Sequence, residues 1–382
     1  MFAQRISRLT SSLVRDILAA ASRPGMISFA GGLPATEALY TPTAAEYAAL
    51  NCAQYGQTEG EPALRELIAA RARTMGIACS AAQVLVLNGS QQGIDLVTKL
   101  FVEEGTPLVV EAPAYLAALQ AFRLFGAALR PVTVDAEQGP VWGDLRAALA
   151  DARLCYLTPT FQNPSGYCYT DAERDTAAGL LDEANVTLFE DDPYRALAFD
   201  APAPQPVVGR LRKARWVYQG SFSKTLSPGL RLGFLIAHPD LITPLTRLKQ
   251  AADLHTNRLS QQLVMQMLQA DKLDAHVASV MPLYQARRAA MQAALQQHMA
   301  DKASWHVPQG GLFFWLKLNR KIDTYALMQR ALEAGVAVMP GEAFYVEQGA
   351  PYSCLRLNFS HSNEADIATG IARLAALMDQ LA

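Results

Sequence analysis

The chain has 382 residues, of which 51% are hydrophobic and 18% charged, and its formal net charge at pH 7 is −2. This near-neutral balance lacks the basic excess of a nucleic-acid-binding surface, and the length is sufficient for a large core and two domains. No apolar run approaches the roughly 18 residues of a membrane span, so we expect neither a nucleic acid nor a membrane as partner.

Five cysteines are scattered along the chain and form no C-x-x-C pair. Their odd number and spacing predict reduced thiols and no bound metal. The basic residues near the N-terminus are not followed by a long apolar segment, so this region does not resemble a signal peptide. These features favour a cytoplasmic protein.

The first elements of the chain are short. Residues 1–30 combine a helical pattern around Ile17 with a small strand at 26–29, and they are too few to fold alone. They must therefore pack against a later part of the chain. A polar, turn-rich stretch at 51–61 follows, and Pro62 then occupies the first position of a predicted helix.

From about residue 84 to residue 237, short continuous apolar runs are separated mostly by amphipathic stretches of helical length. The runs lie at 84–87, 108–110, 154–157, 186–189 and 216–218. Buried strands that alternate with helices predict the α/β class, with a mostly parallel, seven-stranded type of sheet between helices.

The remaining chain is mostly helical at first and then mixed. A long helix is expected at 273–299, broken near Pro282, followed by strands and helices at 311–318, 324–334, 336–339 and 354–359 and by a closing helix. We therefore expect an N-terminal arm (1–40), a large domain (41–272) and a smaller α+β domain (273–382) on which the arm packs.

Polar clusters follow five of the predicted strands. They lie at 88–93, 111–115, 158–166, 190–194 and 221–224. In open α/β sheets, ligands bind outside the carboxyl ends of the strands. The sequence therefore predicts a ligand site where these clusters meet.

Lys224 stands between two apolar runs, so its position should be largely buried. A buried ammonium is unfavourable unless it is paired or its pKa falls, and a lysine with a lowered pKa is the nucleophile that forms Schiff bases. The alternative interpretation is an ordinary loop lysine. Ser221 and Lys224 also match the S-x-x-K pattern of serine acyl-enzymes, but no K-T-G or S-D-N partner is present, and the glycine spacing of a P-loop is absent.

The neighbours of Lys224 predict an anion site. Ser221, Ser223 and Arg231 offer two hydroxyl groups and a guanidinium, which suit a phosphate. The segment 89–93, Gly-Ser-Gln-Gln-Gly, follows a strand and begins a helix, whose free N–H groups attract anions. Considered alone, this segment would be only a turn and a helix cap.

Asp191 comes directly after an apolar strand, where a carboxylate needs a partner, and we predict that it pairs with a cationic ring nitrogen. Asp192 is interpreted as part of a surface turn. Asn163 and Tyr194 can bind a phenolic oxygen of the same ring, and Tyr115 can stack on its face. Together with the lysine and the anion site, these groups describe pyridoxal 5'-phosphate.

Several motifs occur in the order of a known family. They are Asn88-Gly-Ser-Gln-Gln-Gly, Glu190-Asp-Asp-Pro-Tyr, Gly220-Ser-Phe-Ser-Lys, Ala252-Asp-Leu-His-Thr and Gly341-Glu-Ala-Phe-Tyr. Through them the chain resembles the fold-type I aminotransferases of the aspartate aminotransferase superfamily. The resemblance covers nearly the whole chain and is closest to the branch of α-aminoadipate and kynurenine aminotransferases.

The resemblance implies a role for each matching residue. Lys224 would be the Schiff-base lysine and proton shuttle, Asp191 the partner of the ring nitrogen, and Tyr115 the stacking aromatic. Asn163 and Tyr194 would hold the 3'-oxygen, while Ser90, Gln91, Ser221, Ser223 and Arg231 would bind the phosphate. Arg356 would bind the substrate carboxylate with Gly32 and Asn163, Arg15 would meet a side-chain carboxylate, and Tyr55 would contact the phosphate in the other subunit of a homodimer.

We therefore expect a pyridoxal-phosphate-dependent aminotransferase that moves an amino group between an L-amino acid and a 2-oxo acid by a ping-pong mechanism. A β-lyase or decarboxylase of the same fold stays open, because these enzymes share the cofactor chemistry. A transcription regulator with this fold would need an N-terminal helix-turn-helix domain, and the roughly 25 residues before the strand that leads to Gly31 and Gly32 are too few for one. The preferred substrate side chain does not follow from the sequence.

Overall fold

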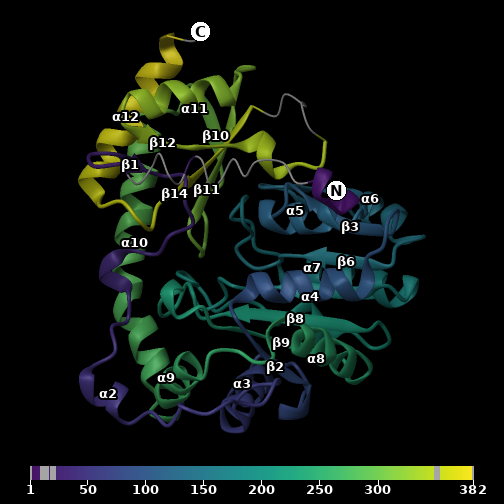
Figure 1. Cartoon of the computed structure of the whole chain (residues 1–382). Coiled ribbons are helices and arrows are strands. Elements are labelled where there is room, and N and C mark those ends of the chain that lie inside the picture. Colours follow the sequence, from purple (N-terminus) through teal and green to yellow (C-terminus); the bar gives the residue numbers. More distant parts are fainter. Residues whose placement is uncertain (1, 9–16, 18–22, 348–352, 381–382) are drawn as a thin grey trace.

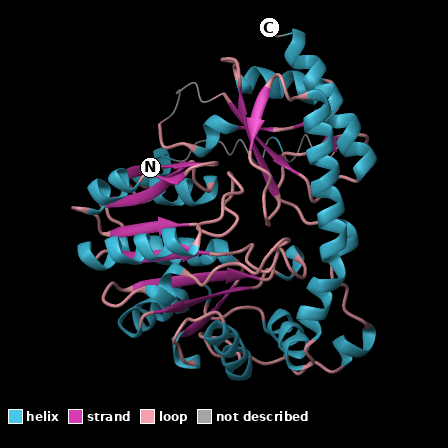
Figure 2. Cartoon of the chain, turned by 180° about the vertical axis from the view of Figure 1, so that it is seen from behind, coloured by secondary structure: helices cyan, strands magenta, loops and turns pink. Residues whose placement is uncertain are grey.

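The computed structural model describes residues 2–8, 17, 23–347 and 353–380. Its central element is an eight-stranded sheet with the strand order β2-β9-β8-β7-β6-β3-β4-β5 (Figures 1 and 2). The strands are β2 (Val84–Leu87), β3 (Pro107–Ala112), β4 (Ala128–Asp135), β5 (Gly139–Pro140), β6 (Leu154–Leu157), β7 (Thr187–Asp191), β8 (Trp216–Ser221) and β9 (Gly233–Ala237). Only β5 and β9 run in the direction opposite to the other six strands, which confirms the predicted mostly parallel α/β sheet.

Helices cover both faces of this sheet because its strands are apolar on both sides. Val84 and Val86 point to one face, where they pack with α3 (Pro62–Thr74), α6 (Trp142–Leu149), α7 (Asp171–Ala184) and α9 (Arg258–Gln269). Leu85 and Leu87 point to the other face and pack with α4 (Ser90–Phe101), α5 (Leu116–Leu124) and α8 (Pro239–Asp253). The alternation of side chains along each strand therefore produces two separate cores.

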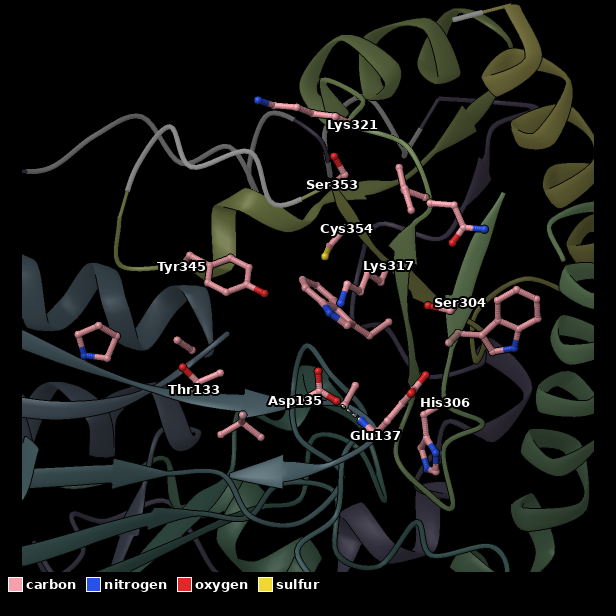
Figure 3. A pocket seen from close by; sticks show the side chains of 18 of the residues that line it. Thr133, Asp135, Glu137, Ser304, His306, Lys317, Lys321, Tyr345, Ser353 and Cys354 are labelled. Atoms are coloured by element: carbon pink, nitrogen blue, oxygen red, sulfur yellow. Dashed lines mark hydrogen bonds between the residues drawn. The ribbon is translucent and has the colours of Figure 1, made fainter. Parts of the chain in front are cut away.

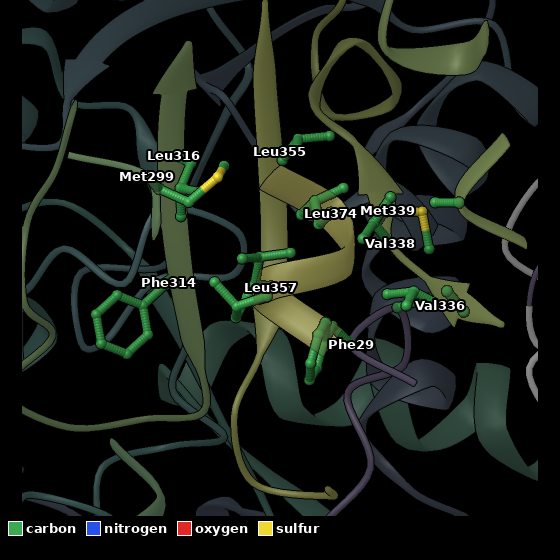
Figure 4. Close-up of a cluster of buried hydrophobic side chains, with 14 of the residues drawn as sticks. Phe29, Met299, Phe314, Leu316, Val336, Val338, Met339, Leu355, Leu357 and Leu374 are labelled. Atoms are coloured by element: carbon green, nitrogen blue, oxygen red, sulfur yellow. The ribbon is translucent and has the colours of Figure 1, made fainter. Parts of the chain in front are cut away.

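A second, four-stranded antiparallel sheet has the order β10-β11-β14-β13. It consists of β10 (Ala303–Trp305), β11 (Phe313–Leu318), β13 (Met339–Pro340) and β14 (Cys354–Asn358), and α10 (Lys272–His298), α11 (Thr324–Glu333) and α12 (Glu364–Gln380) pack with it. Figure 4 shows Leu316, Leu355, Leu357 and Leu374 of this core. The predicted domain boundaries at residues 40 and 272 stay predictions.

The N-terminal segment packs on the later part of the chain, as predicted. Strand β1 (Ile27–Ser28) pairs in parallel with β12 (Val336–Ala337), and Phe29 is fully buried in the same core (Figure 4). Ile17 is also buried there, whereas the rest of the predicted N-terminal helix lies outside the described residues. The pairing places the residues that follow β1 beside the sheet that carries β14.

The prediction of a break near Pro282 is wrong, because α10 continues through this residue. A proline inside a helix removes one backbone hydrogen bond. Here Val280 and Tyr284 are buried on either side of Pro282, and their packing holds the helix together.

The remaining helical segments are short. They are α2 (Ala44–Ala48) and the 3₁₀ helices at Gln4–Arg8, Thr36–Ala38, Ala81–Gln83, Val207–Arg210, Pro228–Leu230 and Gly341–Phe344. Among the described residues, no helix combines the length and the apolar character that crossing a membrane requires.

Candidate functional site

The predicted site residues line one pocket of about 440 Å³. It lies at the carboxyl ends of the parallel strands and is closed on one side by β14 of the second sheet. Its walls include Gly32, Ser90, Gln91, Tyr115, Asn163, Asp191, Tyr194, Ser221, Ser223, Lys224, Arg231 and Arg356. Two predicted residues are not among them: Tyr55 lies elsewhere, and Arg15 lies outside the described residues.

Lys224 lies in the turn between β8 and β9 and is partly buried, because its side chain lines the pocket. Its Nζ donates a hydrogen bond to the carbonyl oxygen of Gly32 at 2.9 Å. Burial lowers the pKa of Lys224 to about 8, and the positive charges of Arg231 and Arg356 add to this effect. A considerable fraction of this amine is therefore neutral, and nucleophilic, near neutral pH.

Asp191 is the last residue of β7 and is 3% exposed. Its Oδ2 accepts a hydrogen bond from the hydroxyl of Tyr156 at 2.8 Å, and its Oδ1 accepts one from Nε2 of Gln219 at 2.9 Å. Burial raises the pKa of Asp191 to about 6, although both hydrogen bonds favour the carboxylate. No lysine, arginine or histidine of the described chain forms an ion pair with it, so a cationic ligand group would find a buried counter-ion here.

The interpretation of Asp192 as a surface residue is wrong, since the side chain is only 4% exposed. Its Oδ2 forms an ion pair with Nε of Arg195 at 2.6 Å and accepts a hydrogen bond from Tyr218 at 3.1 Å. Successive side chains of an extended segment point in opposite directions, so Asp192 points away from Asp191 and meets its own cation in the interior.

The turn at residues 88–92, which we call the Gly89 turn, connects β2 to α4. Gly89 has φ 78°, and a Cβ atom there would collide with the guanidinium of Arg231. A Cβ on Gly233 would lie 2.9 Å from the backbone nitrogen of Ser90. The two glycines thus allow the first N–H groups of α4 and the Arg231 guanidinium to lie side by side. With Ser221 and Ser223 in the same wall, they form a site for an anion.

Arg356 provides a second cationic group on the opposite wall. Its Nη1 donates to Oδ1 of Asn163 at 2.8 Å, and its Nη2 donates to the carbonyl of Ala30. The guanidinium carbon lies 4.4 Å from the ring centroid of Phe313 and 4.9 Å from that of Phe344. Burial lowers the pKa of Arg356 to about 10, and within the described structure its Nε has no hydrogen-bond acceptor. A buried guanidinium with an unsatisfied donor suits a carboxylate ligand.

Tyr194 and Tyr115 complete the pocket. Tyr194 is buried, is hydrogen-bonded to Asn163 and packs edge-to-face on Phe313. Tyr115 directly precedes α5, and burial raises the pKa of its hydroxyl. The pocket therefore combines an amine, two separate anion-binding groups, a buried carboxylate and several aromatic rings.

Tyr55 is 76% exposed and lies outside this pocket. Its ring packs edge-to-face on His255, with the ring centroids 5.7 Å apart. An exposed tyrosine on a polar segment is available to a partner molecule, but within this chain it does not contribute to the site.

A larger cavity, of about 730 Å³, lies between the two sheets (Figure 3). Asp135 and Glu137 line it from the β4–β5 side, and Lys317 and Cys354 line it from the second sheet. It contains none of the twelve residues named above as walls of the smaller pocket. The smaller pocket is the better candidate because the amine, the carboxylate and the guanidinium groups converge there.

The sequence did not reveal some residues that contact these groups. Tyr156 and Gln219 bind Asp191, and Phe313 and Phe344 pack on Arg356. The alternation of a strand would have placed Gln219 on the same face as Ser221, since the two are separated by one residue. Phe344 stands in the motif Gly341-Glu-Ala-Phe-Tyr, which gave it no role, and nothing local marks Tyr156 and Phe313, because their partners lie far away in the chain.

The chain is similar to proteins of known class over its whole length. Residues 24–374 match the family model of aminotransferase class I and II. The 2-aminoadipate transaminase of Thermus thermophilus is 37% identical over 393 residues, covering 100% of this chain and 97% of that protein. A crystal structure of the α-aminoadipate aminotransferase LysN from the same species, complexed with N-(5'-phosphopyridoxyl)-L-leucine, has TM-score 0.89 and 34% identity, covering 100% and 97% of the two chains. The kynurenine aminotransferase of Pyrococcus horikoshii gives TM-score 0.91 and 32% identity with the same coverage.

Proposed function

Since this chain belongs to the family of class I and II aminotransferases, we propose that it moves an amino group between an L-amino acid and a 2-oxo acid with pyridoxal phosphate as cofactor. The observation that carries the proposal is the convergence of Lys224, Asp191 and Arg356 in one pocket. The reaction would proceed as two half-reactions of a ping-pong cycle.

The residues present fit this cofactor. Asp191 is a buried carboxylate without a cationic partner in the described chain, which is the environment that a protonated pyridine nitrogen needs. Bound there, pyridoxal phosphate would supply an aldehyde and a ring that withdraws electrons from the substrate α-carbon. The phosphate would occupy the Gly89 turn, held by Ser90, Gln91 and Arg231.

Lys224 has two tasks in this proposal. Its neutral Nζ is the nucleophile toward the cofactor aldehyde, and the lowered pKa makes this form accessible. Once substrate has displaced it, the same Nζ would carry a proton from the substrate α-carbon to the cofactor carbon that was the aldehyde. The hydrogen bond from Nζ to the carbonyl oxygen of Gly32 supports the placement of the amine, because Gly32 also lines the pocket.

Arg356 would bind the α-carboxylate of the substrate. A hydrogen bond between two charged groups contributes about 1.5 to 3 kcal/mol, and the aromatic rings on either side exclude water from it. Asn163 connects Arg356 to Tyr194, so the groups for the carboxylate and for the 3'-oxygen of the cofactor are held together. Tyr115 would stack on the ring.

Two further assignments concern residues that are not among the pocket walls, Tyr55 and Arg15. We propose that Tyr55 contacts the cofactor phosphate of a second subunit, because it is exposed and does not contact the pocket of its own chain. The active unit would then be a homodimer with shared sites. Arg15 stays a proposed contact for a side-chain carboxylate.

Trapping the cofactor tests the proposal. The purified protein is incubated with pyridoxal phosphate and reduced with borohydride, and the modified peptide is identified by mass spectrometry. We expect one adduct, on Lys224, no adduct in Lys224→Ala, and loss of transamination in that variant. Lys99→Ala is the matched control, because Lys99 lies on the exposed side of α4 in an ion pair with Asp95. An adduct on another lysine, or a fully active Lys224→Ala protein, would refute the assignment.

An assay of the products formed by the purified protein identifies the reaction that dominates. Amino acids are added one at a time together with a 2-oxo acid that accepts the amino group, and the 2-oxo acid formed from the donor, ammonia and carbon dioxide are measured. Formation of the 2-oxo acid that corresponds to the donor, without ammonia or carbon dioxide, is the expected result. Release of ammonia or carbon dioxide as the main product would instead identify a β-lyase or a decarboxylase.

A further inference from the structure

An ion pair between a buried lysine and a partly buried aspartate lies behind the Gly89 turn, outside the pocket. Lys249 on α8 is 0% exposed, and its Nζ lies 2.9 Å from Oδ1 of Asp253 and 3.0 Å from Oε1 of Gln92. Burial of an ammonium is strongly unfavourable unless acceptors surround it. Here they do, and one of them belongs to the first turn of α4.

The pair is connected to both sides of the Gly89 turn. Oδ2 of Asp253 accepts hydrogen bonds from the side-chain amides of Asn88 and Gln92. Oε1 of Gln92 also accepts a hydrogen bond from the backbone N–H of Asn88 at 2.9 Å. Ser90 and Gln91, which line the pocket, lie between these two anchored residues. Asp253 and Lys249 therefore hold the turn from behind without lining the pocket themselves.

This arrangement matters for an anion site because such a site depends on the direction of its N–H groups. A turn that is free to rearrange must be ordered when the anion binds, and that ordering reduces the affinity. A buried ion pair is a poor source of stability, since an apolar pair of similar volume is often as stable or more stable. Its distinct contribution is a fixed set of acceptors and donors at one position.

We propose that Lys249 and Asp253 are positioning residues that fix the Gly89 turn and thereby set the affinity of the protein for the phosphate group of its cofactor. The inference rests on the proposed function, in which the Gly89 turn binds that phosphate. It also gives a role to Asp253 in the segment Ala252-Asp-Leu-His-Thr, which otherwise has no part in the site.

The test compares ligands with and without the phosphate. Lys249→Met and Asp253→Asn keep the size of each side chain and remove its charge. For the apoprotein of each variant, the dissociation constants of pyridoxal phosphate, of pyridoxal and of inorganic phosphate are measured. We expect about tenfold weaker binding of the two phosphate-containing ligands and a change of less than about twofold for pyridoxal. Lys99→Met is the matched control, because it breaks the Lys99–Asp95 pair, which has the same spacing along the helix but lies on the exposed side of α4. This variant should bind all three ligands as the wild type does.

The outcomes separate this inference from the proposed function. If the wild type binds pyridoxal phosphate and both variants bind it as tightly as the wild type does, the positioning role is refuted and the proposed function stands. An equal loss for pyridoxal and pyridoxal phosphate would also refute it, because the change would then be a general loosening of the pocket. A wild type that does not bind pyridoxal phosphate would refute the function itself.

Asn88→Ala covers the case in which the charge variants do not fold. This change removes one of the two side-chain amides that join the turn to Asp253; the amide of Gln92 and the Lys249–Asp253 pair are left in place. Asn88 is only partly buried, so the fold should tolerate the change. The same selective loss of phosphate affinity is expected, and unchanged phosphate affinity would overturn the inference.

Discussion

The lowered pKa of Lys224 leads to a titration that can be measured directly. With a pKa of about 8, roughly a quarter of the Lys224 amine is neutral at pH 7.5, compared with about 0.1% for a lysine at its ordinary value of 10.5. The reactive fraction is thus about two hundred times larger than that of an exposed lysine. Burial is the main cause, and the guanidinium groups of Arg231 and Arg356 add to it.

The assay mixes apoprotein with pyridoxal and follows the visible absorbance band that forms, between about pH 6 and pH 10. Pyridoxal carries no phosphate, so the result does not depend on how tightly a phosphate binds at the anion site. The rate should rise with pH and level off with a midpoint near 8. In Arg231→Gln the midpoint should move toward the ordinary value, because one like charge is removed; Arg231 is exposed, so the fold should tolerate this change.

The pH dependence of the free energy of unfolding is an independent test of the lowered pKa of Lys224. Because the folded pKa of Lys224 is below the unfolded one, the unfolded chain binds more protons between about pH 8 and pH 10.5. The Lys224 amine should therefore make the free energy of unfolding of the apoprotein rise as the pH increases through this window. Lys224→Met should lack this rise. A reaction midpoint near 10, or a midpoint that Arg231→Gln leaves unchanged, would refute this account of the lysine.

Three further predictions concern the other groups. Asp191→Asn should retain the cofactor but lower turnover by about a hundredfold or more, because the ring nitrogen loses its counter-ion; a loss below about tenfold would exclude Asp191 as the ring partner. Arg356→Lys should lower kcat/KM by about ten- to a hundredfold in steady-state kinetics, since a lysine cannot form the two parallel hydrogen bonds of a guanidinium, and an unchanged value would exclude the carboxylate contact. Tyr55→Phe should weaken cofactor binding, and its mixture with inactive Lys224→Ala should form heterodimers with one intact site. Activity that stays at the average of the two parents, once subunit exchange has been verified, would argue against a shared site.

Local patterns in the sequence were sufficient to predict the mostly parallel sheet and most of the residues that line the pocket. Each parallel strand is a short apolar run, and the polar residues directly after it lie at the edge where the strands end. Lys224, Ser221 and Asp191 could therefore be placed near one another before their distances were known. The second cationic group, Arg356, came from the resemblance to a family, because its position on a strand of the other sheet has no local sign of a site.

The tertiary structure decided how these groups are paired. Asp191 and Asp192 are neighbours in the sequence, yet only Asp192 has an arginine beside it, because Arg195 lies on its side of the chain. Gln219 binds Asp191 because β7 and β8 pair in the register that places these two residues opposite each other. Register and helix packing depend on contacts between distant segments, which a single sequence does not display.

Dependence on contacts between distant segments also explains why the burial of Lys249 could not be predicted from the sequence. In the sequence it is an ordinary lysine on an amphipathic helix, for which exposure to solvent is the usual expectation. It is buried only because α8 packs against α4, where Asp253 and Gln92 supply the acceptors for its ammonium. Short apolar runs therefore identify the residues at the strand ends, whereas the packing of α4 against α8, which joins segments far apart in the chain, specifies the residues that hold the Gly89 turn in place.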